Sequence, residues 1–391
     1  MRNSFLCLFV FAVANMGAQN NMADILASIE TNNPELKAGA QIVLSQKAEV
    51  SSQNTLEDPN FEFEHLWGAD NAKDRKYDIS VSQSFDFPSL YVQRNKIGNL
   101  KRTLYDGQQA VLRQQILLQA KELCLQVIYL NRCIRLGNER QAAADELVKL
   151  YRERLTSGDA NILDVNKIEI EQLNITTSNI QRRNELAACL AQLQALNGGE
   201  PLNLAESALT EYSDRELPAS FDDLKEQALQ SDPELQMLRQ ENQIAGKEVS
   251  LNRAGWKFEL GYRHAYELGE RFNGLSVGVS IPLFANRKKV KIAKAQALAG
   301  SFTVNNKELQ TLAALQSSYN EAVALKDNRE RYELLTRQNN FELLQKALAS
   351  GKISMVEYLV DATQLYEAFE NKLSLEYEYQ LRLARMYKFE L

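Results

Sequence analysis

Residues 61–67 read Phe-Glu-Phe-Glu-His-Leu-Trp, and residues 275–281 read Leu-Ser-Val-Gly-Val-Ser-Ile. In both stretches apolar or aromatic side chains alternate with polar or small ones, and this two-residue period is typical of a β-strand with one apolar face. The chain of 391 residues has two further stretches with the same period. It therefore carries four predicted strands, at about 60–67, 76–87, 256–267 and 273–282.

Strands of about ten residues with one apolar face are typical of membrane β-barrels. A soluble sheet gives the same alternation, so the pattern alone leaves both alternatives open. Four strands do not close a barrel, because about eight are needed for one that packs, and an open sheet edge in lipid leaves backbone groups without partners. The membrane interpretation therefore requires several copies of the chain to share one barrel.

The N-terminus has the features of a secretory signal peptide. Arg2 precedes an apolar run at 5–13, which is followed by small and polar residues, and this order predicts cleavage after Ala18 and a signal peptide over 1–18. Cys7 lies inside the apolar run, behind bulky residues, which argues against a lipoprotein site. No later apolar run reaches the roughly 18 residues of a transmembrane helix.

Proline is confined to a few places in the chain. Residues 89–200 and 283–391 contain none, and since proline breaks helix interiors, both stretches are expected to form long helices. Gly in Ser157-Gly-Asp159 and in Ser350-Gly-Lys352 predicts a turn within each stretch. Two helical hairpins result, with outgoing helices over about 92–156 and 287–349 and returning helices over about 162–197 and the last forty residues.

The chain is an internal duplication. Asn33-Pro-Glu-Leu36 recurs as Asp232-Pro-Glu-Leu235, and Ser157-Gly158 recurs as Ser350-Gly351. One collinear alignment orders these short matches, which chance seldom produces. Each copy reads helix, strand, turn, strand and helical hairpin, and the first copy begins with one continuous helix over about 24–54. The predicted domains are a first repeat over 19–200, a linker over 201–220 and a second repeat over 221–391.

Composition and motifs exclude several functions. A net charge of −6 argues against binding nucleic acid by phosphate neutralisation. The usual sequence motifs for phosphate, acyl-transfer or zinc chemistry are absent, so neither enzymatic activity nor a cofactor is expected. His65 and His264 occupy equivalent strand positions and are interpreted as barrel-rim residues rather than as a metal pair. Cys124 and Cys189 either form a disulfide or remain buried free thiols.

The order of these elements resembles that of the TolC-type outer-membrane efflux proteins. The most similar segments are the two turns, where 150–158 runs into 162–165 and 346–351 runs into 355–359. The resemblance implies a mainly α fold with a small membrane β part, in which a homotrimer shares a 12-stranded barrel continued by a periplasmic α-helical barrel. It also implies an outer-membrane channel of a tripartite efflux pump in a Gram-negative bacterium. Such a channel is a passive duct for small molecules that works with a periplasmic adaptor and an inner-membrane transporter of the resistance-nodulation-division or ABC kind.

The resemblance also suggests functional residues. The turns are expected to contact the adaptor through Ser157, Gly158, Asp159, Ser350, Gly351 and Lys352. Asp164 and Glu357 each follow a turn glycine by six residues, and they either form an acidic pore constriction or simply complement a helix dipole. Ile353 and Leu348 stand where a basic and an aromatic gating residue, respectively, can occur in related channels, which argues against a latch of that kind.

Two further alternatives come from the residues themselves. The basic run at 286–289 is interpreted as a solvated helix start, with contact to phosphate or lipid headgroups as the second choice. A periplasmic coiled-coil adaptor or scaffold without channel activity is the alternative function. An adaptor would carry one helical hairpin between β-domains, whereas this chain has two hairpins that each follow two strands, which favours the duct.

Overall fold

The structure is a computed structural model, and most of the chain is described in it. The described residues are 22–67, 75–202, 209–212, 215–218, 220–253, 255–267, 269–281, 285–336 and 340–391. The predicted signal peptide, the turn at 68–74 and Pro282 lie outside the described residues. Between Glu200 and Ser220 the described residues form neither helix nor strand, as expected for a linker.

Two short helices stand where one continuous helix was predicted over 24–54, so that prediction was wrong. Helix α1 spans Met22–Asn32 and α2 spans Pro34–Ser52. Proline has no backbone N–H and is tolerated in the first turn of a helix, so Pro34 ends one helix and begins the next. The break recurs in the second repeat between α5 (Phe221–Ser231) and α6 (Pro233–Leu251), where the Asp232 side chain caps α6. The shared break supports the duplication.

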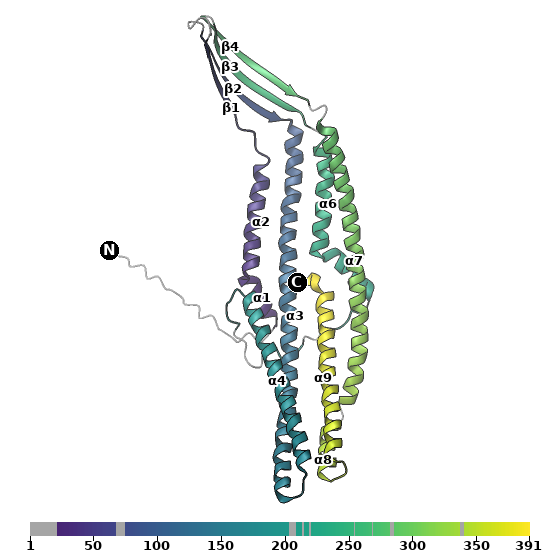
Figure 1. The fold of residues 1–391 in the computed structure, drawn as a ribbon. Helices are drawn as coiled ribbons and strands as arrows, with labels where there is room; N and C mark the ends of the chain where they lie inside the picture. The colour runs from purple at the N-terminus through teal and green to yellow at the C-terminus, as the bar shows by residue number, and fades with distance from the viewer. Residues whose placement is uncertain are drawn as a thin grey trace, which may run out of the picture. The chain divides into compact units, whose positions relative to one another are not determined.

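The four strands form one antiparallel sheet in the order β1-β2-β3-β4 (Figure 1). Their bounds are β1 (Asn60–Trp67), β2 (Arg75–Asp86), β3 (Lys257–Glu267) and β4 (Glu270–Ser280). The first three match the predicted strands to within one residue, and β4 begins three residues earlier than predicted and ends two residues earlier. Pairing of β2 with β3 joins the two repeats, and β1 and β4 are left as the two edges.

Long helices follow each strand pair. In the first repeat α3 spans Pro88–Ser157 and α4 spans Ile162–Leu196, close to the predicted hairpin. In the second repeat α7 (Ala285–Thr336) and α8 (Asn340–Ala349) share the predicted outgoing helix, and α9 (Met355–Met386) returns. A short 3₁₀ turn, η1 (Lys388–Glu390), closes the chain. No helix within the described residues is both long enough and apolar enough to cross a membrane.

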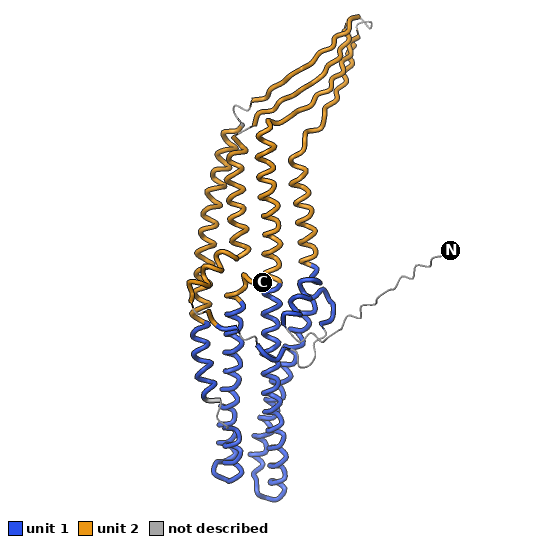
Figure 2. Tube along the Cα trace, turned by 180° about the vertical axis from the view of Figure 1, so that it is seen from behind, with its two compact units in different colours: residues 1–34, 117–216, 322–384 blue, residues 35–116, 217–321, 385–391 orange. Residues whose placement is uncertain are grey.

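The chain forms two compact units, and each draws on both repeats (Figure 2). One unit comprises 1–34, 117–216 and 322–384, and its core includes a cluster from α3, α4 and α9. The other comprises 35–116, 217–321 and 385–391, and it contains the whole sheet together with α2 and α6.

Candidate functional site

The strand register places most apolar side chains of the four strands on one face of the sheet. Phe61 lies opposite Val81, which lies opposite Tyr262, which in turn lies opposite Leu275. Most of this apolar face is solvent-exposed in the single chain; Leu275, for example, is 86% exposed. A soluble sheet would bury such a face against a core. The register therefore confirms the predicted two-sided sheet and leaves its apolar side without a partner within the described chain.

The opposite face of the sheet is mainly polar, with Leu66 and Phe272 as large apolar exceptions. Two of its cross-strand rows consist of Glu62, Ser80, Arg263 and Gly274, and of Asn60, Ser82, Gly261 and Ser276. Arg263 on β3 forms an ion pair with Asp78 on β2, so a charge pair spans the junction between the repeats. Only small and polar side chains lie in the second row, which leaves this face open to water.

Aromatic rings gather at both ends of the apolar face. Near the β1–β2 turn, Tyr77 stacks on Tyr266 with ring centroids 5.0 Å apart, and His264 lies 6.3 Å from Tyr77. At the helical end, Phe87 and Phe258 approach to 6.0 Å. Aromatic girdles of this kind flank the apolar band of membrane barrels.

The structure separates the two histidines and leaves the described cysteines as free thiols. His65 lies on β1 and His264 on β3, with β2 between them, and His264 Nδ1 lies 2.6 Å from Asn273 Oδ1. Cys124 and Cys189 are both buried and free, so the disulfide alternative is wrong. Burial raises the pKa of the Cys124 thiol to about 12. No group of side chains suited to a metal ion occurs among the described residues.

The two helical-hairpin turns share one backbone geometry. Gly158 and Gly351 have φ values of +83° and +70°, which favour glycine. At the first turn Asp159 N donates to Arg154 O at 2.8 Å, and at the second Lys352 N donates to Ala347 O at 2.9 Å. These bonds are typical of the Schellman motif that ends helices. All six residues predicted to contact an adaptor are exposed: Ser157, Gly158, Asp159, Ser350, Gly351 and Lys352.

The helices that return from these turns are capped differently. Asn161 Oδ1 accepts a hydrogen bond from Leu163 N at 3.0 Å and caps α4. At α9, Ser354 Oγ accepts from Glu357 N at 3.2 Å, while Glu357 Oε2 accepts from Ser354 N at 2.7 Å. This reciprocal pair is a capping box.

The two predicted constriction carboxylates therefore differ. The hydrogen bonds from Ser354 hold the pKa of Glu357 below its ordinary value, and this carboxylate has a helix-capping role. Asp164 is half-buried, and its carboxylate makes no side-chain hydrogen bond within the described part of the chain. The structure shows no contact between the two.

An apolar cluster fixes the hairpin ends together. Val148 and Tyr151 of α3, Val165 and Ile168 of α4, and Tyr358 of α9 are buried in it. Leu348 and Ile353, the residues at the expected gating positions, also pack against the cluster. A hollow of about 260 Å³ lies beside it, lined by α3 residues such as Leu150 and by α8 residues such as Leu348. Both side chains therefore contribute to apolar packing at this end of the hairpins.

Three arginines link the first hairpin to α9, and sequence reasoning missed them. Arg132 Nη1 lies 2.5 Å from Glu376 Oε2, and Arg182 Nη2 lies 2.8 Å from Glu370 Oε1. Arg140 pairs with Glu171 on α4, and its guanidinium carbon lies 5.0 Å from the centroid of the Tyr366 ring on α9. Charged residues are common on all these helices, so spacing along one helix does not show which charges meet across two.

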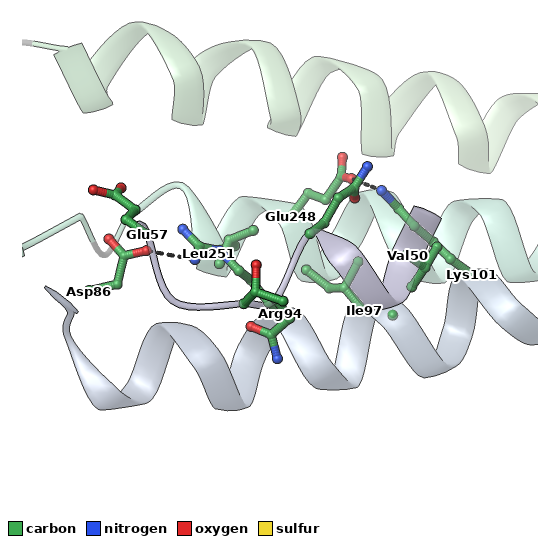
Figure 3. A pocket seen from close by; sticks show the side chains of 12 residues that line it. Val50, Glu57, Asp86, Arg94, Ile97, Lys101, Glu248 and Leu251 are labelled. Atoms are coloured by element: carbon green, nitrogen blue, oxygen red, sulfur yellow. Dashed lines mark ion pairs between the residues drawn. The ribbon is translucent and has the colours of Figure 1, made fainter. Parts of the chain in front are cut away.

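A polar cavity of about 390 Å³ lies where the first strand pair meets its helix (Figure 3). Arg94 Nη1 lies 2.6 Å from Asp86 Oδ2, whose side chain is only 7% exposed. Lys101 pairs with Glu248 at 3.8 Å, and Lys257 pairs with Glu57. The charges at this junction therefore neutralise one another within the chain.

Comparison with known proteins agrees with this geometry. A family model described as outer membrane efflux protein matches residues 224–389. The alkaline protease secretion protein AprF of Pseudomonas aeruginosa is 23% identical over 342 residues, which cover 81% of this chain and 70% of AprF. The resemblance to the TolC-type outer-membrane efflux family is confirmed.

Solved structures show the same fold. CusC, described in connection with transmembrane channel formation, has a TM-score of 0.80 at 17% identity, covering 95% of this chain and 92% of CusC. The CmeC outer membrane channel of Campylobacter jejuni has a TM-score of 0.74 at 12% identity, covering 94% of this chain and 85% of CmeC. The description of the matching family names the outer membrane and efflux. CusC and CmeC are described as channels, so the comparisons do not support the adaptor alternative.

Proposed function

We propose that three copies of the chain close their sheets into one 12-stranded barrel and form a passive export duct across the outer membrane. The observation that carries the proposal is the strand register, which gathers most apolar side chains on one face and most polar ones on the other. In a closed barrel the apolar face contacts lipid and the polar face lines a water-filled lumen. The edges of β1 and β4 then pair with neighbouring copies, as a lipid environment requires.

The helices supply a second argument for assembly with further copies. Helix α4 carries exposed apolar side chains at heptad spacing: Leu163, Ile170, Leu173 and Ile180, each more than half exposed. Intervals of seven, three and seven residues form a coiled-coil seam. Within the described chain this seam has no partner, and a neighbouring copy would cover it.

The hairpin turns are the proposed contact with a periplasmic adaptor. The hollow beside Leu150 and Leu348 offers apolar surface for an amphipathic helix. The exposed turn residues Ser157–Asp159 and Ser350–Lys352 add polar groups next to it. Through this adaptor the duct would receive cargo from an inner-membrane transporter of the resistance-nodulation-division or ABC kind. Asp164 and Glu357 would place two carboxylates per copy near the periplasmic mouth.

Arginine substitutions on the two sheet faces test the proposal. Val81→Arg places a charge on the exposed apolar face, which costs about 2–4 kcal/mol at the middle of a bilayer. Ser80→Arg is the matched control, because its side chain points to the polar face. We expect the wild-type protein and Ser80→Arg to migrate as an oligomer on unheated gels of outer-membrane fractions. We expect Val81→Arg to lose this oligomer. Equal behaviour of the two variants would show that the apolar face does not contact lipid.

A further inference from the structure

The first turns of α7 carry a concentrated positive charge. Five basic residues are exposed there: Arg287, Lys288, Lys289, Lys291 and Lys294. We refer to these five as the basic surface. No acidic residue occurs in α7 before Glu308. None of the five forms an ion pair with any residue that the structure describes.

The basic surface lies where the apolar face of the sheet ends. Strand β4 ends at Ser280 and α7 begins at Ala285. Val279 and Ile281, just before the helix, are each about half exposed. Ala293 is buried further along α7, whereas the side chains of all five basic residues are exposed.

The corresponding place in the first repeat has its charges neutralised. When Pro88 after β2 is aligned with Pro282 after β4, Arg94 takes the place of Lys288. Arg94 pairs with Asp86. The residue that aligns with Asp86 is Ser280, which has no carboxylate. The second junction therefore keeps its positive charge for a partner outside the described chain.

We propose that the basic surface binds the headgroup phosphates of anionic phospholipids in the membrane leaflet that faces the periplasm. Clusters of Lys and Arg directly beside a membrane-embedded segment attract anionic lipids. The inference rests on the proposed function, because contact of the apolar sheet face with lipid brings the basic surface to headgroup depth.

The distribution of the charges favours lipid over a second copy of the chain. Arg287, Lys291 and Lys294 share one stripe of α7, whereas Lys288 and Lys289 point about 100° and 200° around the helix axis from Arg287. A helix–helix seam would use one stripe with matching acidic residues. Charges that spread over the exposed sides of a helix fit a layer of headgroups better.

The test compares two triple variants of the full-length oligomer. Lys288→Gln/Lys289→Gln/Lys291→Gln removes three charges from the basic surface. The control, Lys149→Gln/Lys167→Gln/Lys247→Gln, removes three exposed lysine charges elsewhere. It therefore has the same net charge as the first variant. Binding of phosphatidylglycerol and of phosphatidylcholine to each detergent-solubilised protein is measured by native mass spectrometry. Oligomer and single-channel conductance are measured on the same preparations.

We expect wild-type protein and the control to prefer phosphatidylglycerol, and the first variant to lose that preference by about tenfold or more while it keeps its oligomer and conductance. Equal phosphatidylglycerol binding by the two variants would overturn the inference. So would dissociation of the first variant alone, which would show that a second copy covers the basic surface. Absence of an oligomer and of conductance in wild-type protein would instead contradict the proposed function, whatever the lipid preference.

Discussion

The two strand-to-helix junctions occupy equivalent places in the repeats but handle charge in opposite ways. At the first, Asp86 and Arg94 form a pair beside a polar cavity (Figure 3). At the second, Ser280 and Lys288 take their places, and the lysine has no carboxylate partner among the described residues. The second junction thus lacks the carboxylate that neutralises the first, and its helix carries more basic residues, so it presents positive charge outward. Duplication has preserved the backbone plan while the surface chemistry of the two halves has diverged.

We expect the largest effect on stability from breaking the ion pair at the first junction. Arg94→Gln leaves Asp86 buried without its partner, and loss of a hydrogen-bonded ion pair at a largely buried carboxylate should lower the free energy of unfolding by about 2 kcal/mol. Lys288→Gln at the equivalent position should change it by less than about 0.5 kcal/mol. Urea midpoints of the detergent-solubilised proteins measure both. Similar losses in the two variants would show that the junctions do not differ as described.

Substitutions at the two hairpin turns test a feature that the repeats share. Gly158→Ala and Gly351→Ala each place a Cβ atom on a residue with left-handed backbone geometry. The added Cβ would contact no neighbouring atom, so the cost comes from the backbone conformation alone and should be about 1–2 kcal/mol of folding free energy. The two losses should be equal, because both turns are Schellman motifs. Hydrogen exchange at the Asp159 and Lys352 amides reports each turn separately. A loss confined to one turn would contradict their equivalence.

The helix caps next to these turns should respond differently to pH. Asn161→Ala and Ser354→Ala should each cost about 1 kcal/mol as lost N-caps. Only the second cap contains a titrating group, and the pKa of Glu357 is lowered in the folded state. Its contribution is therefore present above the ordinary glutamate pKa and is lost as the pH falls through the lowered folded value.

Hydrogen exchange at the Ser354 amide measures this pH dependence. In the wild-type protein, protection of the Ser354 amide from exchange should fall in acid. In Glu357→Gln, protection of this amide should no longer depend on titration of the carboxylate at position 357. The Leu163 amide at the first cap is the internal control, since Asn161 does not titrate. Equal acid sensitivity at both amides would remove the capping box as the cause.

The smallest expected effect concerns ion selectivity. Asp164→Ala with Glu357→Ala should reduce cation preference in planar bilayers, because each removes a carboxylate near the proposed mouth. Since Glu357 is held by its own helix terminus, the single variant Asp164→Ala should account for most of the change. Unchanged reversal potentials in the double variant would eliminate the acidic constriction and leave the duct intact.

Much of the fold could be predicted from the sequence because its signals are local. The two-residue period located β1 and β2 to within one residue, and Gly158 and Gly351 marked both turns. The break at Pro34 was missed because an apolar helical period continues on both sides of it. The links from Arg132, Arg140 and Arg182 to α9 could not be predicted, because they join residues that are far apart in the sequence.

The pairing of β2 with β3 also dictates when the sheet is able to form. Lys76 pairs with Glu267, about 190 residues later in the chain. Until the second repeat has arrived, the hairpin of β1 and β2 is a two-stranded ribbon, which is at best marginally stable in water. The newly exported chain therefore carries an apolar, unpaired strand edge through the periplasm while most of its length is still to follow. Such an edge invites aggregation until β3 has arrived to pair with β2.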